Sequence, residues 1–171
     1  MTQVYLSLGS NLGREKNIIA GLDALAQQFG ELQISRVYES ESVGFKGSRF
    51  FNLVVGITTD KTIPTLSETL KKIEDDNGRL RTGPKYSPRT LDIDILTYDN
   101  FIGVVAGVKL PRGEILENAF VLLPLSELAP NAVHPICQKS YANLWQAYDK
   151  NAQSLWPIFF EWHGRVISSP E

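Results

Sequence analysis

The sequence contains only one cysteine, Cys137, so no disulfide bond can form within the 171-residue chain. Small proteins of oxidising compartments usually depend on such bonds, and we therefore expect a cytoplasmic protein. The first residues also lack the basic segment followed by an apolar one that marks a signal peptide. Histidine is scarce as well: His134 and His163 lack the spacing of metal ligands, so neither is predicted to bind metal or to act as a base.

The chain also lacks a long apolar run and an excess of basic residues. No run of about 18 apolar residues is present that could cross a bilayer, and we expect no membrane partner. The formal net charge is −2, which argues against a general nucleic-acid-binding protein. Hydrophobic residues make up 43% and charged residues 21% of the chain, as in globular proteins. The length predicts a single domain, residues 1–171.

Hydrophobic periodicity predicts the element order βαββαβ for the first part of the chain. The strands are expected at residues 4–8, 32–39, 50–59 and 90–97, and the helices at 15–29 and 64–77. This order is typical of a ferredoxin-like α+β fold with an antiparallel sheet. Beyond it we expect an edge strand at 101–110 and a short apolar helix within 118–130, interrupted by Pro124.

Residues 131–171 are predicted to form a C-terminal extension. This segment holds all three tryptophans and the aromatic run LWPIFFEW, residues 155–162. One interpretation is a flap that packs on the core. The other is an exposed surface for weak self-association.

The segment SPRTLDIDI, residues 87–95, places two acidic side chains on one face of a predicted strand. Side chains alternate along a strand, so Asp92 and Asp94 point away from the face that carries Leu91, Ile93 and Ile95. Their Cα atoms would lie roughly 6.6 Å apart, and charges of like sign at that separation repel unless solvent or a cation lies between them. The basic residues that precede them are Arg79, Arg81, Lys85 and Arg89.

Carboxylates beside arginines suggest a magnesium-bound polyphosphate. Magnesium is typically held by one or two carboxylates, together with substrate phosphates and waters, and arginine can bind phosphate oxygens through two hydrogen bonds. Two ions about 3.5 to 4 Å apart could be bridged by Asp92 and Asp94. Two alternatives remain open: polar residues on the wet face of an antiparallel sheet, or a structural network of salt bridges.

The segment RFFNLVV, residues 49–55, combines an aromatic and an amide side chain on one strand face. If Phe51, Leu53 and Val55 face the core, Phe50 and Asn52 lie on the opposite face. A flat heterocycle could then stack on Phe50 and form hydrogen bonds with Asn52. The alternative is a core phenylalanine beside a surface asparagine.

Five motifs, in order, resemble the signatures of the 6-hydroxymethyl-7,8-dihydropterin pyrophosphokinase family of folate biosynthesis. They are GSNLG, FFN, IEDDNGRLR, SPRTLDIDIL and NAFVLLPLSELAP, and they cover about residues 4–130. The resemblance implies transfer of the β,γ-pyrophosphoryl group of ATP to the hydroxymethyl oxygen of the pterin, leaving AMP. It also implies a ferredoxin-like core, usually monomeric, with two magnesium ions on Asp92 and Asp94.

The resemblance further assigns residues to the two substrates. ATP would be bound, and the site closed, by residues on the nucleotide side: Glu74, Arg79, Arg81 and Arg89. The pterin would be held by Asn52 between Phe50 and Phe120. A loop whose backbone reads the pterin edge would include Ser40, Ser42 and Val43.

The chain departs from the family pattern at three positions. Arg112 stands where the family usually has histidine, Asn118 stands where it usually has arginine, and Glu41 replaces a typical proline of the pterin loop. The first two positions normally help to grip the triphosphate. Because one arginine is gained and one is lost, we expect Arg112 to take over part of this clamp.

Two other classes of function remain as alternatives. A divergent family member could bind pterin or nucleotide without catalysis, since the clamp is altered. An RNA-recognition motif shares the βαββαβ order. However, KGSRFFNLVV does not fit the aromatic signature of that motif, and two exposed aspartates would repel a phosphate backbone.

Overall fold

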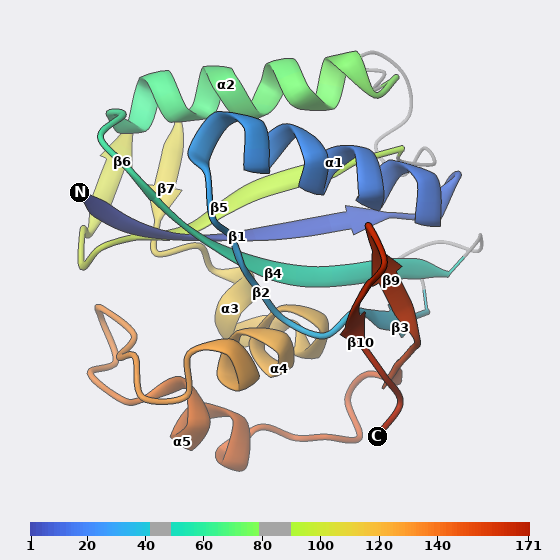
Figure 1. Cartoon of the computed structure of the whole chain (residues 1–171). Helices are drawn as coiled ribbons and strands as arrows, with labels where there is room; N and C mark the ends of the chain where they lie inside the picture. Colours follow the sequence, from blue (N-terminus) through green and yellow to red (C-terminus); the bar gives the residue numbers. More distant parts are fainter. Residues whose placement is uncertain (42–48, 79–89) are drawn as a thin grey trace.

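A six-stranded antiparallel sheet forms the centre of the computed structural model, which describes residues 1–41, 49–78 and 90–171 (Figure 1). The strands lie in the order β5 (Asp92–Tyr98), β1 (Thr2–Ser10), β4 (Phe50–Thr59), β3 (Tyr38–Ser40) and β8 (Leu155–Pro157). The remaining strand, β2 (Gln33–Ile34), also pairs with β4. Because β1 lies between β4 and β5, it joins the two strands that carry the motifs singled out above.

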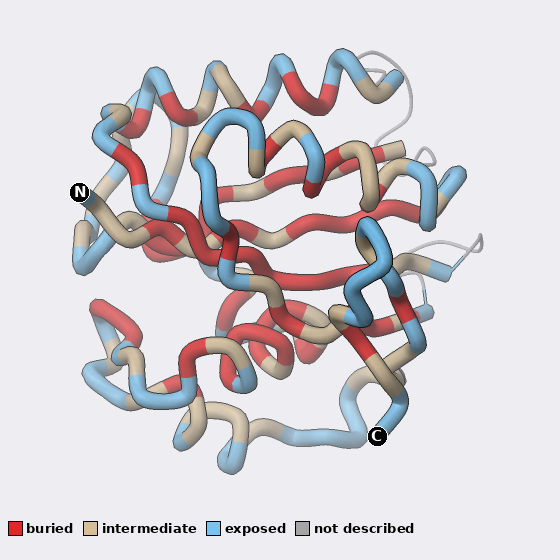
Figure 2. Tube along the Cα trace, in the orientation of Figure 1, coloured by how far each residue is buried: buried red, intermediate tan, exposed pale blue. Residues whose placement is uncertain are grey.

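Two helices cover one face of this sheet, α1 (Arg14–Phe29) and α2 (Ile63–Asp76) (Figure 1). Their inward sides carry the fully buried Leu22 and Leu66, which belong to one hydrophobic cluster with β1, β4 and β5. Thr62 begins α2, because its side chain accepts a hydrogen bond from the backbone N–H of Thr65. In Figure 2, α1 and α2 alternate between red and paler segments, whereas the strands beneath them are largely red.

The opposite face is covered by three further helices, α3 (Glu114–Glu117), α4 (Ala119–Leu128) and α5 (Tyr141–Ala147). Val54 of β4 and Leu96 of β5 point to this side and form a second buried cluster with Leu122. Both faces of the sheet are therefore packed against helices. The predicted mixture of helices with an antiparallel sheet is confirmed. Of the described helices, none combines the length and the apolar character that crossing a membrane requires.

The predicted boundaries agree with β1, α1, β4, α2 and β5 to within two residues. The single strand expected at 32–39 is instead divided into β2 and β3. The division lies at Ser35, whose hydroxyl accepts the backbone N–H of Val54 at 2.8 Å. A side chain thus replaces a backbone partner, which interrupts the regular ladder.

The prediction of an edge strand at 101–110 is wrong. These residues form a separate two-stranded hairpin of β6 (Gly103–Val105) and β7 (Val108–Leu110). Its two central residues, Ala106 and Gly107, have φ values of 51° and 80°. Positive φ at both positions matches the turn whose twist suits a tight hairpin, so the chain reverses instead of extending the main sheet.

The interruption predicted at Pro124 is also wrong, because α4 continues through this residue. Proline removes one hydrogen bond of the helix. Its neighbours Val121 and Leu125 are buried in the second cluster, and Pro124 is itself buried. We attribute the continuity of α4 to this packing, which offsets the lost bond.

The C-terminal extension packs on the core, as the first of the two interpretations predicts. Phe160, in the hairpin of β9 (Phe160–Trp162) and β10 (Arg165–Ser168), is buried in the cluster beneath α1. Trp162 donates a hydrogen bond from its indole nitrogen to Asp23 of α1 at 2.9 Å.

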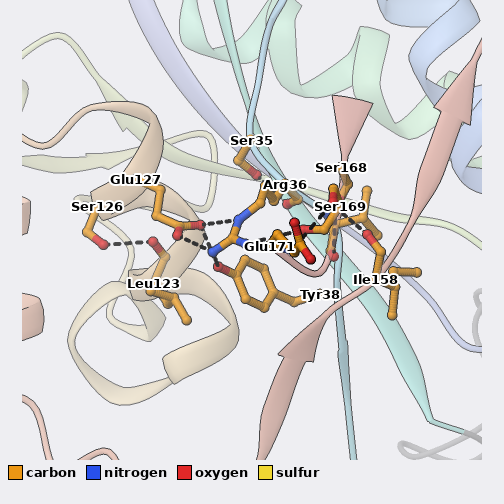
Figure 3. A network of polar contacts seen from close by, with 11 residues as sticks. Ser35, Arg36, Tyr38, Leu123, Ser126, Glu127, Ile158, Ser168, Ser169 and Glu171 are labelled. Atoms are coloured by element: carbon orange, nitrogen blue, oxygen red, sulfur yellow. Dashed lines mark hydrogen bonds and ion pairs between the residues drawn. The ribbon is translucent and has the colours of Figure 1, made fainter. Parts of the chain in front are cut away.

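A polar network also joins this extension to β3 and α4 (Figure 3). Glu127 of α4 accepts hydrogen bonds from Arg36 and from the hydroxyl of the buried Tyr38. Arg36 donates a further bond to the backbone oxygen of Ser169, and the Ser168 hydroxyl accepts the backbone N–H of Val37.

The network predicts how stability depends on alkaline pH. Burial, followed by the hydrogen bond to Glu127, raises the pKa of Tyr38 well above its ordinary value. A raised pKa in the folded state stabilises the protein below the unfolded value near 10, and the benefit is lost as pH rises above it. At pH 8, Tyr38→Phe should lower the free energy of unfolding by about 1 kcal/mol. Urea denaturation should show the gap between the two proteins closing between pH 8 and about 11.

Candidate active site

The two aspartates of β5 lie on the sheet face that also carries the second cluster. Ile93 and Ile95 point the other way and are buried beneath α2. Asp92 and Asp94 are half-buried, opposite Gly9 and Ser7 of β1. The alternation predicted for this strand is therefore confirmed.

Residues opposite one another across an antiparallel pair point to the same face, and this places Asn52 in one row with Asp92. Gly9 of β1 lies between them, opposite Asn52 on one side and Asp92 on the other. A Cβ atom at Gly9 would lie 3.2 Å from the side-chain oxygen of Asn52 and 3.9 Å from the ring of Phe50. Glycine thus keeps the surface of the sheet open between the amide and the carboxylate.

The orientation of Asn52 is fixed by β3. Its amide nitrogen donates a hydrogen bond to the hydroxyl of Ser40 at 2.8 Å, and both residues are more than nine-tenths buried. Phe50 lies directly opposite Ser40 in the β3–β4 pair. Phe51, by contrast, packs against the cluster on the other face. The predicted separation of Phe50 and Asn52 from the core-facing residues is confirmed.

Phe120 approaches the same face of the sheet from α4. It is the second residue of that helix and is half-buried against the cluster that includes Val54 of β4. The helix begins at Asn118, whose side chain makes no capping bond of its own. Instead, Asn118 accepts a hydrogen bond from the side-chain nitrogen of Gln153 at 3.0 Å.

Glu74 connects α2 to β5 between the two aspartates. Its carboxylate accepts the backbone N–H of Ile93 at 2.7 Å, and only 6% of the residue is exposed. Ile93, the residue between Asp92 and Asp94, is therefore held in place by a side chain of α2. Glu74 also lines the pocket described next, so a second role toward a bound molecule is compatible with its position.

A pocket of about 470 Å³ opens beside Asp94, between α2, β5 and the β6–β7 hairpin. One part of its lining is apolar and includes Leu70, Ile93, Ile95 and Val108. The basic residues of the lining are Lys71, Lys109 and Arg112. The lining also holds three acidic residues, Glu74, Asp94 and Glu114. The pocket thus combines both signs of charge, as a site for phosphate bound together with magnesium would.

Arg112 is anchored at the mouth of this pocket. Its backbone N–H donates to the carbonyl of Leu96 in β5 at 2.9 Å. Its guanidinium forms an ion pair with Glu114 and lies 3.8 Å from a carboxylate oxygen of Asp94. The arginine found where the family has histidine thus lies next to the predicted metal ligand, whereas Asn118 is engaged by Gln153.

The structure gathers the described candidates into two neighbouring groups. Ser40, Phe50 and Asn52 lie at one end of the row, with Phe120 approaching that face from α4. Asp92 and Asp94 lie at the other end, where Arg112 adjoins Asp94 and Glu74 reaches β5 from the opposite face. The predicted residues Ser42, Val43, Arg79, Arg81 and Arg89 are outside the described residues. Sequence reasoning missed the role of Gly9, although its motif GSNLG was noted, and it missed Gln153, for which no motif exists.

The two histidines lie away from these groups. The ring of His134 accepts backbone N–H groups of Ile136 and Cys137, and burial lowers its pKa. His163 pairs with Asp23 on α1. Within the described ranges, no group of three or more histidine, cysteine or acidic side chains could by itself hold a metal ion. Two carboxylates nevertheless fit magnesium when substrate phosphates supply the other ligands.

Comparison with protein families gives a match over residues 5–130 to the model of 7,8-dihydro-6-hydroxymethylpterin-pyrophosphokinase. A 2-amino-4-hydroxy-6-hydroxymethyldihydropteridine pyrophosphokinase of Aquifex aeolicus is 37% identical over 142 residues, 81% of this chain and 88% of that protein. The folic acid synthesis protein FOL1 of Dictyostelium discoideum is also 37% identical, over 77% of this chain. The chain spans only 20% of the length of this Dictyostelium protein.

Among solved structures, the HPPK-DHPS of Plasmodium falciparum with pteroate superimposes with a TM-score of 0.74. The match covers 98% of this chain and 47% of that one, at 13% sequence identity. At this identity the likeness shows the fold alone. It extends past residue 130, so the C-terminal extension is included in the structural match.

Proposed function

The chain belongs to the 7,8-dihydro-6-hydroxymethylpterin-pyrophosphokinase family, and on this premise we propose that it is an ATP-dependent pyrophosphokinase of folate biosynthesis. It transfers pyrophosphate from ATP to the hydroxymethyl group of 6-hydroxymethyl-7,8-dihydropterin, giving AMP and the pterin diphosphate. Membership of this family removes the ground for the RNA-binding alternative.

The observation that carries the proposal is the row formed by Asp92, Gly9 and Asn52 on three neighbouring strands. An amide suited to a heterocycle lies at one end, and a carboxylate suited to a metal–phosphate complex lies at the other. The glycine between them leaves room for the substrate bond that changes. Transfer at phosphorus depends mainly on positioning and charge neutralisation. The row would supply the positioning, and a cation held at its carboxylate end would supply the neutralisation.

On the nucleotide side, we assign the pocket beside Asp94 to ATP. Its apolar lining suits the base, and Lys71, Lys109 and Arg112 suit the phosphates. Two magnesium ions on Asp92 and Asp94 would neutralise phosphate charge during transfer. Family resemblance adds Glu74, Arg79, Arg81 and Arg89 to this side of the site.

On the pterin side, we assign the ring to the space between Phe50 and Phe120, with Asn52 reading its edge. This assignment is supported by the fixed orientation of the Asn52 amide, which is held by a buried hydrogen bond to Ser40. Ser42 and Val43 would contribute backbone groups, by resemblance. Glu41, in place of the usual proline, is exposed at the start of this loop.

Asn52→Ala should therefore weaken pterin binding by roughly 1 to 3 kcal/mol, because a site built to form hydrogen bonds is left with unpaired groups. Binding of magnesium-ATP should change little. Isothermal titration calorimetry with each ligand measures both effects, and Asn143→Ala on the exposed side of α5 is the matched control. Loss of ATP binding with intact pterin binding would place Asn52 on the nucleotide side instead.

A coupled assay of AMP release with ATP and the hydroxymethyl pterin tests the function itself. Formation of AMP that depends on the pterin is the expected result. Binding of both ligands without AMP would favour the alternative of a non-catalytic family member, which the engagement of Asn118 by Gln153 leaves open.

We also propose a ferredoxin-like core within a single domain, residues 1–171, that acts as a monomer in the cytoplasm. The strand order β5–β1–β4–β3 supports the fold. The two hydrophobic clusters on opposite faces of one sheet support the single domain. The single cysteine supports the compartment.

A further inference from the structure

The segment 148–157 connects the two walls of the proposed pterin site. It lies beyond residue 130, where the family match ends. It leaves α5, contacts the N-terminus of α4 through Gln153, and joins the sheet as β8 beside β3. It therefore contacts both the helix that carries Phe120 and the strand that carries Ser40.

At the helix end, Gln153 takes the place of a capping residue. The first N–H groups of a helix have no partner within it, and Asn118 does not supply one to α4. The side-chain oxygen of Gln153 accepts the N–H of Ala119 at 2.8 Å, and its nitrogen donates to Asn118. Tyr148 adds a bond from its hydroxyl to the carbonyl of Glu117 at 2.7 Å. The backbone immediately before Phe120 is thus held from the extension.

At the sheet end, β8 pairs with β3 so that Leu155 lies opposite Ser40 and Trp156 lies opposite Glu39. The Trp156 indole N–H donates to Glu39 at 2.9 Å. The guanidinium of Arg49, the residue before β4, lies 4.9 Å from the centre of the Trp156 ring. Trp156 therefore links the end of β3 to the residue before β4 from the α1 face of the sheet, which is the face opposite the bond between Ser40 and Asn52.

Only two residues, Ser154 and Leu155, separate these two attachments. The three residue steps from Gln153 to Trp156 reach at most about 11 Å, so the two residues cannot move apart freely. Phe120 and Asn52 are attached to them through α4 and β3. The segment therefore limits how far the two walls can separate.

We infer that Gln153 and Trp156 are positioning residues for the pterin, which set the distance between Phe120 and the Asn52 side of the site. This inference rests on the function proposed above. The nucleotide pocket lies on the far side of Asp94 and has no lining residue in this segment. The effect should consequently be confined to the pterin.

Steady-state kinetics of Gln153→Ala test the inference. The KM for the pterin should rise roughly five- to tenfold, as for a lost pair of hydrogen bonds, while the KM for ATP stays within about twofold. Gln153→Glu should restore the pterin KM, because a carboxylate still accepts the Ala119 N–H and the Asn118 amide can rotate to donate. Gln146→Ala, an exposed glutamine of α5, is the matched control and should change neither KM.

Trp156→Phe is the second variant, and it decides the question if Gln153→Ala does not fold. It keeps a ring beneath Arg49 but loses the donor to Glu39, so the pterin KM should rise severalfold with the ATP KM unchanged. Equal rises of both KM values, or an unchanged pterin KM in both variants, would overturn the inference while the unmutated protein still forms AMP. Absence of AMP from the unmutated protein would instead overturn the proposed function, and the inference with it.

Discussion

Replacing Asp92 or Asp94 by asparagine is expected to abolish AMP formation while leaving the fold intact. Each replacement keeps the size of the side chain but removes one negative charge from the pair that would hold magnesium. Both side chains are only half-buried, and the buried side of β5 is formed by Ile93 and Ile95, which remain. Turnover at saturating magnesium and ATP, together with the thermal unfolding midpoint, measures both parts of this prediction.

Asp60→Asn provides the control for this pair, because Asp60 is an exposed aspartate in the link between β4 and α2. It should retain full activity. Unchanged turnover in either Asp92→Asn or Asp94→Asn would show that the carboxylates belong to a polar sheet face and not to a metal site.

Arg112→Ala is expected to lower kcat/KM by on the order of 10², the scale for losing one preorganised group that stabilises the transition state. The guanidinium lies 3.8 Å from Asp94 and lines the pocket assigned to ATP, where it can neutralise phosphate charge. Arginine side chains stay charged at neutral pH, so the loss should be nearly constant between pH 6 and 8. Rate measurements across this range give both the size and the pH dependence.

Arg112→His sharpens this test, because it restores the residue usual for the family. Histidine loses its charge over this pH range, so the activity of this variant should fall relative to the unmutated enzyme as pH rises from 6 to 8. The exposed Arg165 of β10 offers a control, and Arg165→Ala should have no effect. A loss below about tenfold in Arg112→Ala would show that this arginine lies outside the clamp.

Much of the sheet could be predicted because its strands have a regular side-chain alternation. In β4 and β5, apolar residues recur at every second position, and this alone separates Asn52 and Asp92 from the core. The division of the second strand could not be predicted, because Ser35 replaces a ladder partner only when Val54 lies beside it. The β6–β7 turn also escaped prediction, since Ala106 is an unusual residue at positive φ.

Some residues of the candidate site could likewise be predicted from the sequence, and others could not. Local alternation places Asp92 with Asp94 on one face of β5, and Phe50 with Asn52 on one face of β4. That both pairs share the same face of the sheet follows only from the register of β1 between these strands. The contribution of Gly9 depends on the register of β1 between β4 and β5. That of Gln153 depends on a return of the chain to Asn118 from 35 residues later. Periodicity within a short window carries no information about either.

The pairing of β8 with β3 has a consequence for the solubility of the protein. β3 is only three residues long, and without β8 its outer N–H and C=O groups would be free to pair with a strand of another molecule. Such edge-to-edge pairing is a common start of aggregation, and here it would occur at the strand that carries Ser40. By occupying this edge with its own chain, the protein keeps β3 from becoming a template for association.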